Sequence, residues 1–409
     1  MSNWIKVKLG DIVELKRESY QPKPDEVLPY IGLEHIGQGT LRLISVGKSN
    51  EVTSTKSYFS KGDILFGKLR PYFRKVVRPK FNGVCSTDIL VLTSKNPRKF
   101  NQTFLFYLMA SQEMIDLATA SSSGTKMPRA DWKVLQNLEI SIPEDVNEQE
   151  RIGKILETID DKIDINIRMN KTLEEMAMTL YKHWFVDFGP FQDGEFVESE
   201  LGMIPEGWEC IEIGEAVSVL GGGTPKTSVK EYWENGDINW FSPTDLTTQK
   251  SLFISKSSKK ITKLGLEKSS AKLFPPYCVM MTSRATIGEI SINREEACTN
   301  QGFITLIPNE TFTMYQLYFW LKTNMDLILS IANGSTFKEV SKTNFKKLKI
   351  LKPKNIEEFT QKCEKLFKLI ESNLIEIEEL TNIKDYLLPR LLSGEIDVSQ
   401  AEKQVEEVL

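Results

Sequence analysis

The sequence predicts an α+β protein with an internal pseudo-two-fold repeat: two mixed α/β domains separated by two long helices that form an antiparallel coiled coil. Two observations lead to this fold class. Similar motifs recur at an offset of about 204–214 residues along the 409-residue chain. Each copy also ends in a long, charged segment with apolar residues at helical spacing. Two copies in one chain suit the recognition of two separate half-sites.

The repeated motifs follow one another in the same order in both copies. A tryptophan stands five residues before a short Leu/Ile-Gly-acid motif, a later glycine follows, and the pattern Leu-x-Ile-x-x-Pro ends the copy. The matched residues are Trp4 and Trp208, Gly10 and Gly214, Gly124 and Gly334, Ile140 and Ile350, and Pro143 and Pro353.

Five segments are expected along the chain: mixed domains at 1–145 and 191–353, long helices at 146–190 and 354–396, and an acidic tail at 397–409. Short β-rich runs bounded by Gly, Asn, Ser or Pro predict strands in each mixed domain. These runs are 64–66, 89–92 and 138–140, then 279–281 and 303–306. One helix is expected in each copy, over 104–118 and 315–331.

The first long helix is predicted from residues 147–187, which contain no proline and stop at Gly189-Pro190. Its 3-4 stripe comprises Ile152, Leu156, Ile159, Ile163, Asn166, Asn170, Leu173, Ala177, Leu180 and Trp184. The second stripe comprises Leu366, Ile370, Asn373, Ile377, Leu380, Lys384, Leu387 and Leu391. Roughly 40 helical residues span about 60 Å.

Asn166 and Asn373 occupy the same place in the two stripes. A buried asparagine in a coiled-coil interface fixes register and partner, so the helices are expected to pair with each other. The alternative is two unrelated surface helices. The aromatic cluster of Trp184, Phe185 and Phe188 exceeds what two helices can bury, so we expect it to contact a partner protein.

Composition indicates a protein of the cytoplasm. No apolar run is long enough to cross a membrane, and the first residues carry no signal pattern. The five scattered cysteines form no C-x-x-C motif, and only His35 and His183 could assist them, so no metal site is expected.

The net charge of −4 conceals a segregation of charge along the chain. Residues 1–145 carry 21 basic against 15 acidic residues and residues 201–353 carry 18 against 15, whereas 146–200 carry 6 against 13 and 354–409 carry 7 against 13. Both mixed domains are therefore positive and both helical segments negative. Contact with a polyanion is local, so this pattern favours DNA binding by the mixed domains.

The strongest basic window is 56–99, with 11 basic against 2 acidic residues and interleaved aromatics. Basic side chains contact phosphates, and arginine also hydrogen-bonds guanine. A solvated loop is the alternative. The candidate DNA-binding residues of the first domain are Lys68, Arg70, Tyr72, Arg74, Lys75, Arg78, Lys126 and Arg129.

The second domain carries a weaker equivalent run at 282–288, followed by Asn300 and Gln301, and a glycine-rich segment at 221–227. Such side chains read base edges, and backbone amides of a glycine loop contact phosphate. Local turns are the alternative in each case. The candidate residues are Thr224, Lys226, Trp240, Ser283, Arg284, Thr286, Asn300, Gln301 and Lys338.

No catalytic set is found. Phe274-Pro275-Pro276-Tyr277 lacks the Asn or Asp that a nucleic-acid amino-methyltransferase loop needs, so a turn before a strand is expected. The glycine-rich segment lacks the Gly-Lys-Ser/Thr end of a phosphate-binding loop. Asp160 and Asp161 are expected on the solvated face of an acidic helix.

The chain resembles, over essentially its whole length, the specificity subunit of type I restriction–modification systems. The motifs that carry the resemblance are 222–226 with Tyr232-Trp233, 236–238 and Trp240; 148–152; 173–176 running to 184–188; and 387–396. The resemblance implies two target recognition domains that each recognise half of a bipartite DNA site, and an antiparallel coiled coil that separates them.

The resemblance also implies a non-catalytic chain that assembles with two modification (methyltransferase) subunits and with motor/nuclease subunits. S-adenosylmethionine, ATP and Mg would belong to those partners. The helix residues expected at the coiled coil and partner contacts are Ile159, Ile163, Asn166, Leu173, Leu180, Trp184, Phe185, Leu366, Ile370, Asn373, Leu380 and Leu387. The alternatives are the DNA-reading part of a self-sufficient modification enzyme and a structural coiled-coil scaffold.

Overall fold

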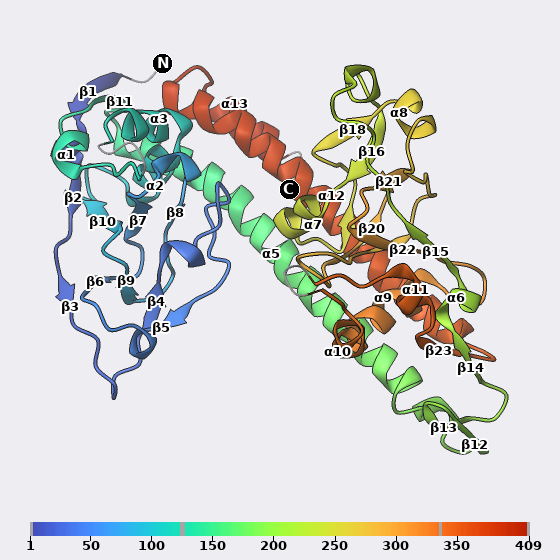
Figure 1. Ribbon diagram of the computed structural model, residues 1–409. Helices are drawn as coiled ribbons and strands as arrows, with labels where there is room; N and C mark the ends of the chain where they lie inside the picture. The colour runs from blue at the N-terminus through green and yellow to red at the C-terminus, as the bar shows by residue number, and fades with distance from the viewer. Residues whose placement is uncertain (1–2, 123–126, 335–337, 407–409) are drawn as a thin grey trace. The chain divides into compact units, whose positions relative to one another are not determined.

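The computed structural model describes residues 3–122, 127–334 and 338–406. These residues form two compact units (Figure 1). The first unit joins Met1–Ile165 to Glu376–Leu409, and the second comprises Asn166–Ile375. Each unit therefore holds one mixed domain together with part of α5 (Val146–Phe185) and part of α12 (Glu357–Ser393).

The first mixed domain is mostly β, with short helices. Its strands are β1 (Trp4–Lys8), β2 (Val13–Leu15), β3 (Ser19–Tyr20), β4 (Pro29–Ile31), β5 (Gly47–Lys48), β6 (Lys56–Phe59), β7 (Ile64–Gly67), β8 (Val76–Val77), β9 (Gly83–Cys85), β10 (Ile89–Ser94) and β11 (Glu139–Pro143). Its α-helices are α1 (Leu9–Ile12), α2 (Gln102–Ala110), α3 (Gln112–Ala120) and α4 (Trp132–Leu135).

The second mixed domain has the same kinds of element. Its strands are β12 (Phe196–Ser199), β13 (Gly202–Pro205), β14 (Glu209–Glu212), β15 (Ser218–Gly221), β16 (Ile238–Phe241), β17 (Phe253–Ile254), β18 (Lys259–Ile261), β19 (Val279–Thr282), β20 (Ile290–Asn293), β21 (Ala297–Thr299), β22 (Phe303–Ile307) and β23 (Lys349–Lys352). Its α-helices are α6 (Ile213–Ala216), α7 (Pro243–Gln249), α8 (Lys263–Glu267), α9 (Met314–Thr323), α10 (Met325–Ser330) and α11 (Lys342–Lys346).

Strand pairing confirms the internal repeat. In the first domain β10 lies antiparallel between β2 and β7, and in the second β22 lies antiparallel between β15 and β19. The parallel pair β4–β9 is matched by β16–β21, and the closing pair β1–β11 by β14–β23. The sequence motifs at the two ends of each copy are thus the two strands that close each domain.

The repeated glycines have one structural reason in both copies. The Gly10 amide donates to the Gln136 carbonyl at 2.8 Å, and a β-carbon added at Gly10 would lie 2.8 Å from that oxygen. At Gly214 an added β-carbon would lie 2.9 Å from the β-carbon of Lys346. Each glycine allows a short helix to approach the segment before the closing strand, and a larger residue would push the two apart.

The two helices expected within the mixed domains are each broken. The segment predicted as 104–118 forms α2 and α3, which meet at Ser111, and the segment 315–331 forms α9 and α10, which meet at Asn324. Ser111 adopts an extended backbone conformation, and its hydroxyl accepts the Met114 amide as the N-cap of α3. The continuous apolar spacing masked this break, because both helices bury apolar faces in one core.

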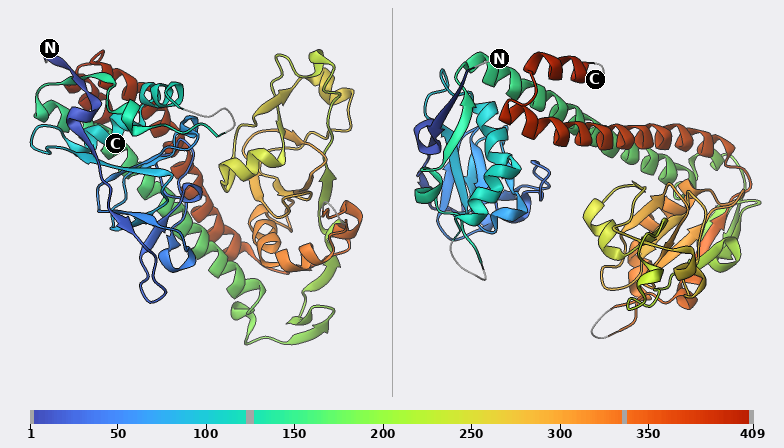
Figure 2. Two further views of the ribbon diagram at one scale, coloured as in Figure 1. Left: turned by 60° about the vertical axis from the view of Figure 1, so that its left-hand side comes forward. Right: turned by 90° about the horizontal axis from the view of Figure 1, so that it is seen from above.

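Helices α5 and α12 lie side by side and run antiparallel (Figure 2). In the first unit Ile155 and Leu156 of α5 share a core with Leu388 and Leu391 of α12. In the second unit Ala177 of α5 shares a core with Phe367 of α12. The expected coiled coil is confirmed. Early residues of one helix meet late residues of the other in both units.

The two asparagines at the matching place of the stripes are buried. Asn166 and Asn373 are both buried, and the Asn373 Nδ2 donates to the Asn170 Oδ1 at 2.8 Å. Because an amide pair between helices is satisfied in only one register, it opposes sliding of α12 along α5.

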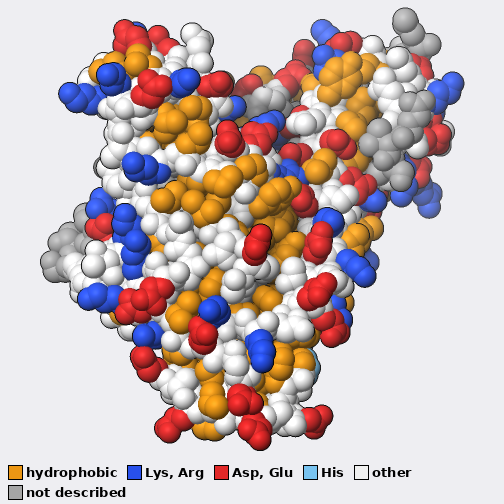
Figure 3. Space-filling view, turned by 90° about the vertical axis from the view of Figure 1, so that its right-hand side faces the viewer, with side chains coloured by type: hydrophobic (Ala, Val, Ile, Leu, Met, Phe, Trp, Pro, Cys, Tyr) orange, Lys and Arg blue, Asp and Glu red, His pale blue; other side chains and the backbone are white. Residues whose placement is uncertain are grey.

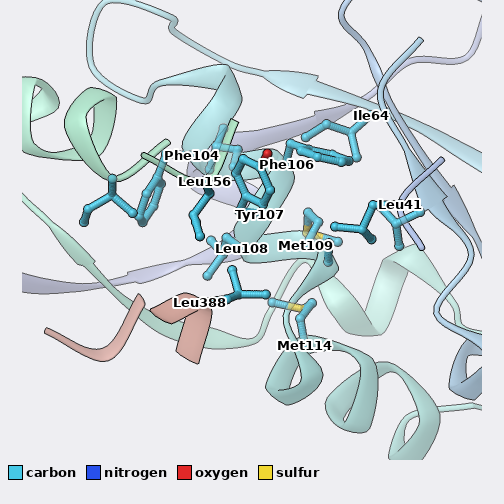
Figure 4. Packing of buried hydrophobic residues seen from close by; sticks show 14 of the residues in the cluster. Leu41, Ile64, Phe104, Phe106, Tyr107, Leu108, Met109, Met114, Leu156 and Leu388 are labelled. Carbon is cyan, nitrogen blue, oxygen red and sulfur yellow. The ribbon is translucent and has the colours of Figure 1, made fainter. Parts of the chain in front are cut away.

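The first domain is built onto the helix pair through one continuous core. Figure 4 shows Phe104, Tyr107 and Met109 of α2 in this core with Leu156 of α5 and Leu388 of α12. The chain then turns at Gly394, where φ is +74°, and α13 (Val398–Glu406) packs Val398, Ala401 and Val405 into the same core. The expected acidic tail is therefore partly a packed helix.

Asp160 does not lie on a solvated face, contrary to the expectation for this residue. Its carboxylate accepts Lys384 Nζ at 2.7 Å, Arg42 Nη2 at 2.8 Å and the Tyr107 hydroxyl at 2.9 Å. Burial, followed by the charge of Asp160, raises the pKa of Tyr107, so the hydroxyl remains a donor. Asp160 thus joins both long helices and the mixed domain.

One ion pair repeats between the two copies. Arg78 follows β8 and pairs with Glu157 on α5, and Arg294 follows β20 and pairs with Glu371 on α12, Nε to Oε1 at 3.2 Å. Strands β8 and β20 are equivalent in the repeat, since each pairs antiparallel with the equivalent strands β7 and β19. Each mixed domain is thereby fastened to one long helix by an arginine at the same place.

We predict that Asp160→Ala destabilises the first unit by about 3 kcal/mol, because it leaves the charge of Lys384, 5% exposed, without its partner. The neighbouring pair Asp161–Lys80 is exposed, and Asp161→Ala is the matched control, with a loss below about 1 kcal/mol. Urea unfolding, monitored by hydrogen exchange of the backbone amides in α2 and α12, measures the loss of stability in both variants. Equal losses in the two variants would refute the role of Asp160.

Candidate nucleic-acid interface

Three segments of the first mixed domain meet at one end of β7 and β10. The Lys68 amide donates to the Asp88 carbonyl at 2.9 Å, the Arg70 amide to Pro128 at 2.8 Å and the Ala130 amide to Lys68 at 2.9 Å. We call the surface formed by residues 68–72, 86–88 and 127–130 loop face 1. Backbone hydrogen bonds between segments far apart in sequence hold its side chains in place.

The second mixed domain repeats this arrangement bond for bond. The Ser283 amide donates to Gly302 at 2.8 Å, the Ala285 amide to Lys338 at 3.2 Å and the Val340 amide to Ser283 at 2.9 Å. We call residues 283–286, 300–302 and 338–340, with the adjoining 221–226, loop face 2. Ser283 takes the place of Lys68, so the structure confirms that the weak run 282–288 is the equivalent of the basic run.

The two faces also share an unusual backbone conformation. Arg70 and Ala285 occupy equivalent positions, and both have positive φ, 51° and 61°. For residues other than glycine this left-handed conformation costs roughly 1–2 kcal/mol. Strain of this kind concentrates at functional sites, and here it recurs at the same point of both copies.

Loop face 1 presents cationic and aromatic side chains. Lys68 and Arg70 are partly exposed, Tyr72 is 49% exposed, and the Arg129 side chain is 48% exposed, its Nε donating to Asp88 Oδ1 at 3.2 Å. The Nε of Arg70 is buried and finds no hydrogen-bond acceptor among the residues that the structure describes. An acceptor supplied by a ligand would satisfy it.

Three other predicted cations are held inside the first unit. Arg74 donates from Nε to the Ala110 carbonyl at 2.7 Å, and burial lowers the pKa of its guanidinium. Lys75 donates to the Leu33 carbonyl at 2.6 Å. Arg78 donates to Thr103 at 2.7 Å, pairs with Glu157 and lies over the Phe106 ring. For these three the structure supports the alternative of a local structural role.

The glycine-rich segment of loop face 2 is shaped by close contact. The Gly223 amide donates to Thr299 at 2.8 Å, and a β-carbon on Gly222 would lie 2.0 Å from the Asn300 carbonyl. Trp240 is buried and donates from Nε1 to the Gly223 carbonyl at 2.9 Å. Trp240 therefore supports the loop from beneath and does not itself present a surface.

The remaining predicted residues of loop face 2 divide into exposed and supporting ones. Ser283 is buried, and Asn300 accepts the Gly302 amide at 2.8 Å, so both shape the loops. Arg284, with its side chain 47% exposed, is paired through Nη2 with Glu339. The exposed candidates are Lys226, Thr286, Gln301 and Lys338, with Thr224 hydrogen-bonded to Gln301. Lys126 of the first domain lies outside the described residues.

The described residues give no support for a metal site, a membrane-spanning helix or a reactive thiol. No group of three or more His, Cys, Asp and Glu side chains there could hold a metal ion, and no helix there is long and apolar enough to cross a membrane. Phe274 is buried and precedes a turn before β19, as expected from its sequence. Burial raises the pKa of the thiols of Cys85, Cys278, Cys298 and Cys363 to about 12, which disfavours their reactive thiolate form.

The expectation that Trp184 and Phe185 are available to a partner protein is wrong. Both are only 6% exposed and pack with Phe359 and Trp208 in the core of the second unit. The sequence pattern showed an aromatic excess over a two-helix pair, but it could not show that the mixed domain itself covers these rings.

A different stripe of α5 is exposed, and of its residues only Leu180 was among those expected at partner contacts. Met169 and Met176 are exposed, and a groove is lined by Thr172, Met176, Leu180 and His183. These residues recur at spacings of three and four on one side of the helix. A second 3-4 pattern beside the buried stripe was the signal available in the sequence.

Comparison with known proteins identifies the family. A family model described as the type I restriction modification DNA specificity domain matches residues 1–175 and 205–385. The specificity subunit of the type I restriction enzyme HindI from Haemophilus influenzae is 27% identical over 467 aligned residues, covering 97% of this chain and all of that protein. The specificity subunit of MjaIX from Methanocaldococcus jannaschii is 37% identical over 161 residues, 39% of this chain and 37% of that protein.

The fold is shared with a solved structure. The crystal structure of a type I restriction–modification S subunit from M. genitalium matches with a TM-score of 0.57 at 18% identity, covering 95% of this chain and 96% of that one. The family model covers both copies of the repeat, and the likeness to this structure spans both domains and both long helices. The chain therefore belongs to the type I restriction–modification DNA specificity family, as the non-catalytic DNA specificity subunit of a type I restriction–modification complex.

Proposed function

We propose that each mixed domain reads one half of a bipartite double-stranded DNA site through its loop face. The observation that carries this proposal is the bond-for-bond equivalence of the two loop faces, each with a strained residue at the same point. Two equivalent surfaces in one chain suit two half-sites. The experiment that tests it is sequencing of methylated DNA from a host that expresses this chain with its modification subunit.

Within this proposal the two faces contribute different chemistry. Lys68, Arg70 and Arg129 of loop face 1 supply phosphate contacts, and the Nε–H of Arg70, which has no acceptor among the described residues, donates to a phosphate oxygen. On loop face 2, Gln301 and Arg284 are suited to adenine and guanine edges. Lys226 and Lys338 there supply the cations that approach the backbone.

The long helices serve the partners of the complex. We propose that two modification subunits dock on the helices and that the exposed stripe of α5 around Met169 and Met176 is one contact. Exposed apolar side chains in a row commonly mark protein interfaces. Motor/nuclease subunits then join, and S-adenosylmethionine, ATP and Mg are bound by these partners. In this assembly the present chain recognises the DNA sequence and positions the other subunits on the DNA.

We predict that the triple variant Lys68→Ala, Arg70→Ala, Arg129→Ala binds DNA more weakly and loses about 0.9 of the logarithmic salt slope for each phosphate contact removed. The matched control changes Lys95, Arg98 and Lys99, which are exposed cations at the other end of β10, to alanine. Fluorescence anisotropy over a salt series measures both. If the two variants bind alike, loop face 1 does not contact DNA.

We predict that Arg284→Gln relaxes recognition at one half-site only. Loss of a bidentate base contact costs about 1–3 kcal/mol of discrimination, whereas the half-site read by the first domain keeps its sequence. Methylome sequencing of hosts that express each complex reports both half-sites at once. Arg129→Gln, which removes a proposed phosphate contact of loop face 1, is the control and should leave the sequence of both half-sites unchanged. An unchanged bipartite site in the Arg284→Gln variant would contradict the assignment.

We predict that Met176→Glu reduces co-purification with the modification subunit at least five-fold, because a charge within an apolar contact remains without a partner. Leu264→Glu, a similarly exposed apolar residue on α8 of the same unit, should have no effect. DNA binding of the isolated chain checks that the fold is intact. Equal recovery of the modification subunit with both variants would exclude this stripe as a contact.

A further inference from the structure

The hairpin β12–β13 connects α5 to the second mixed domain. It lies between the end of α5 and β14, which opens that domain, and it forms a two-stranded sheet of its own. The hairpin is therefore separate from the sheets that carry loop face 2. Its composition is also unlike the rest of the domain.

The segment around the hairpin is strongly acidic. Residues 183–225 contain nine Asp and Glu residues and no Lys or Arg. Lys349 and Lys352 of β23 pair with Glu200 and Glu209 at 3.1 and 2.9 Å. Asp193, Glu195, Glu198 and Glu206 have no ion pair with any described residue. Uncompensated carboxylates repel a DNA backbone, so this surface does not face DNA.

Apolar side chains are exposed among these carboxylates. Val186, Leu201 and Met203 are 51%, 48% and 55% exposed, and Val197 is 40% exposed. Figure 3 shows acidic and hydrophobic side chains gathered together on the lower part of this face, where Figure 1 places β12 and β13. Contiguous exposed apolar groups surrounded by charged residues commonly mark interaction sites on a protein surface.

A pocket opens beside the hairpin. It has a volume of about 310 Å³ and is lined by Leu201 and Val186 together with Phe188, Trp320 and Gln316. Gln316 is 1% exposed, and its Nε2 donates to the Leu351 carbonyl at 3.0 Å. Its Oε1 is buried and has no donor among the described residues. A ligand for this pocket therefore combines an apolar group with a hydrogen-bond donor.

We propose that the hairpin and this pocket form a docking site for a protein segment that presents an apolar side chain next to lysine or arginine residues. The apolar side chain enters the pocket, a backbone N–H of the segment donates to Gln316 Oε1, and the basic residues pair with Glu198 and Glu206. A second copy of this chain fits poorly as occupant, because a two-fold contact would bring the same acidic surfaces together.

The exposed apolar groups outside the pocket favour a polypeptide over a small molecule. Met203 shares a face of the hairpin with its cross-strand partner Glu198 and does not line the cavity, so a ligand confined to the cavity would leave it in water. A peptide that crosses this face covers Met203 and reaches Glu198 as well.

The test uses the full-length chain and synthetic 15-residue peptides that overlap along the modification and motor/nuclease subunits. Only this choice of peptides rests on the proposed function. Binding is followed by fluorescence anisotropy of labelled peptides. We expect the peptides that bind to combine a Leu, Ile, Met or Phe with at least two Lys or Arg, and their binding to weaken as salt rises. Each is compared with a version in which Glu replaces the basic residues.

Two variants separate the parts of the site. Leu201→Asp with Met203→Asp should lower the affinity at least ten-fold, and Glu198→Lys with Glu206→Lys should lower it for basic peptides only. Leu264→Asp on α8 is the control and should bind as the unchanged chain does. DNA binding by all variants should remain intact, which shows folding and keeps this outcome independent of DNA recognition.

Three results would overturn the proposal. The first is that no peptide binds. The second is that the acidic versions of the peptides bind as well as the basic ones. The third is that the hairpin variants bind the peptides as tightly as the unchanged chain does. Methylation of a bipartite site by the assembled complex is scored separately. Loss of that activity in the unchanged complex would contradict the proposed function, whereas intact activity with any of the three results would reject the docking site alone.

Discussion

The structure depends on how two basic domains are held to acidic helices. Arg78–Glu157 and Arg294–Glu371 join the equivalent strand ends of the two domains to α5 and α12, respectively. Asp160 adds contacts to Arg42, Tyr107 and Lys384. Partly buried pairs of this kind cost much to break, because each partner then remains charged in a poorly solvated place. They fix each domain to its helix and so fix where its loop face lies.

This arrangement changes the meaning of the charge segregation. The acidity of α5 would indicate a solvated helix if its carboxylates faced water. Several of these carboxylates instead form ion pairs with cations of the first domain. Part of the basic window 56–99 is therefore internal: Arg78 and Lys80 pair with α5. Fewer cations of this window are therefore free to contact DNA than the sequence count suggests, and Lys68, Arg70 and Arg129 are the cations of loop face 1 that the proposed function assigns to phosphates.

The fold was largely predictable because its signals are local. The repeat, the paired stripes with Asn166 and Asn373, and the strands around Phe66 and Leu90 follow from spacing and composition. The breaks at Ser111 and Asn324 were not, because apolar spacing continues across both. An apolar pattern at helical spacing shows that one face of a segment is buried, but it does not show which element covers that face.

The site was less predictable because its contacts join distant segments. That Phe359 covers Trp184 and that Trp208 covers Phe185 depends on the approach of segments far apart in sequence. The roles of Arg74 and Lys75 depend on which backbone carbonyls lie within reach. Residue type and density thus pointed to the segment that forms part of loop face 1, whereas the division of its cations into exposed and internal ones required the tertiary structure.

The two loop faces differ in the side chains that they present. Ala285 stands where loop face 1 has Arg70, Ser283 stands where it has Lys68, and the acidic Glu339 stands where it has Arg129. The backbone frame is common to both faces, so the difference in charge resides in side chains alone. We expect loop face 1 to contribute more of the salt-dependent affinity. Loop face 2, with amide and hydroxyl groups around Gln301, is expected to depend more on hydrogen bonds to bases. Under the proposed function, a repeat that keeps its backbone bonds and exchanges its side chains reads two different half-sites with one architecture.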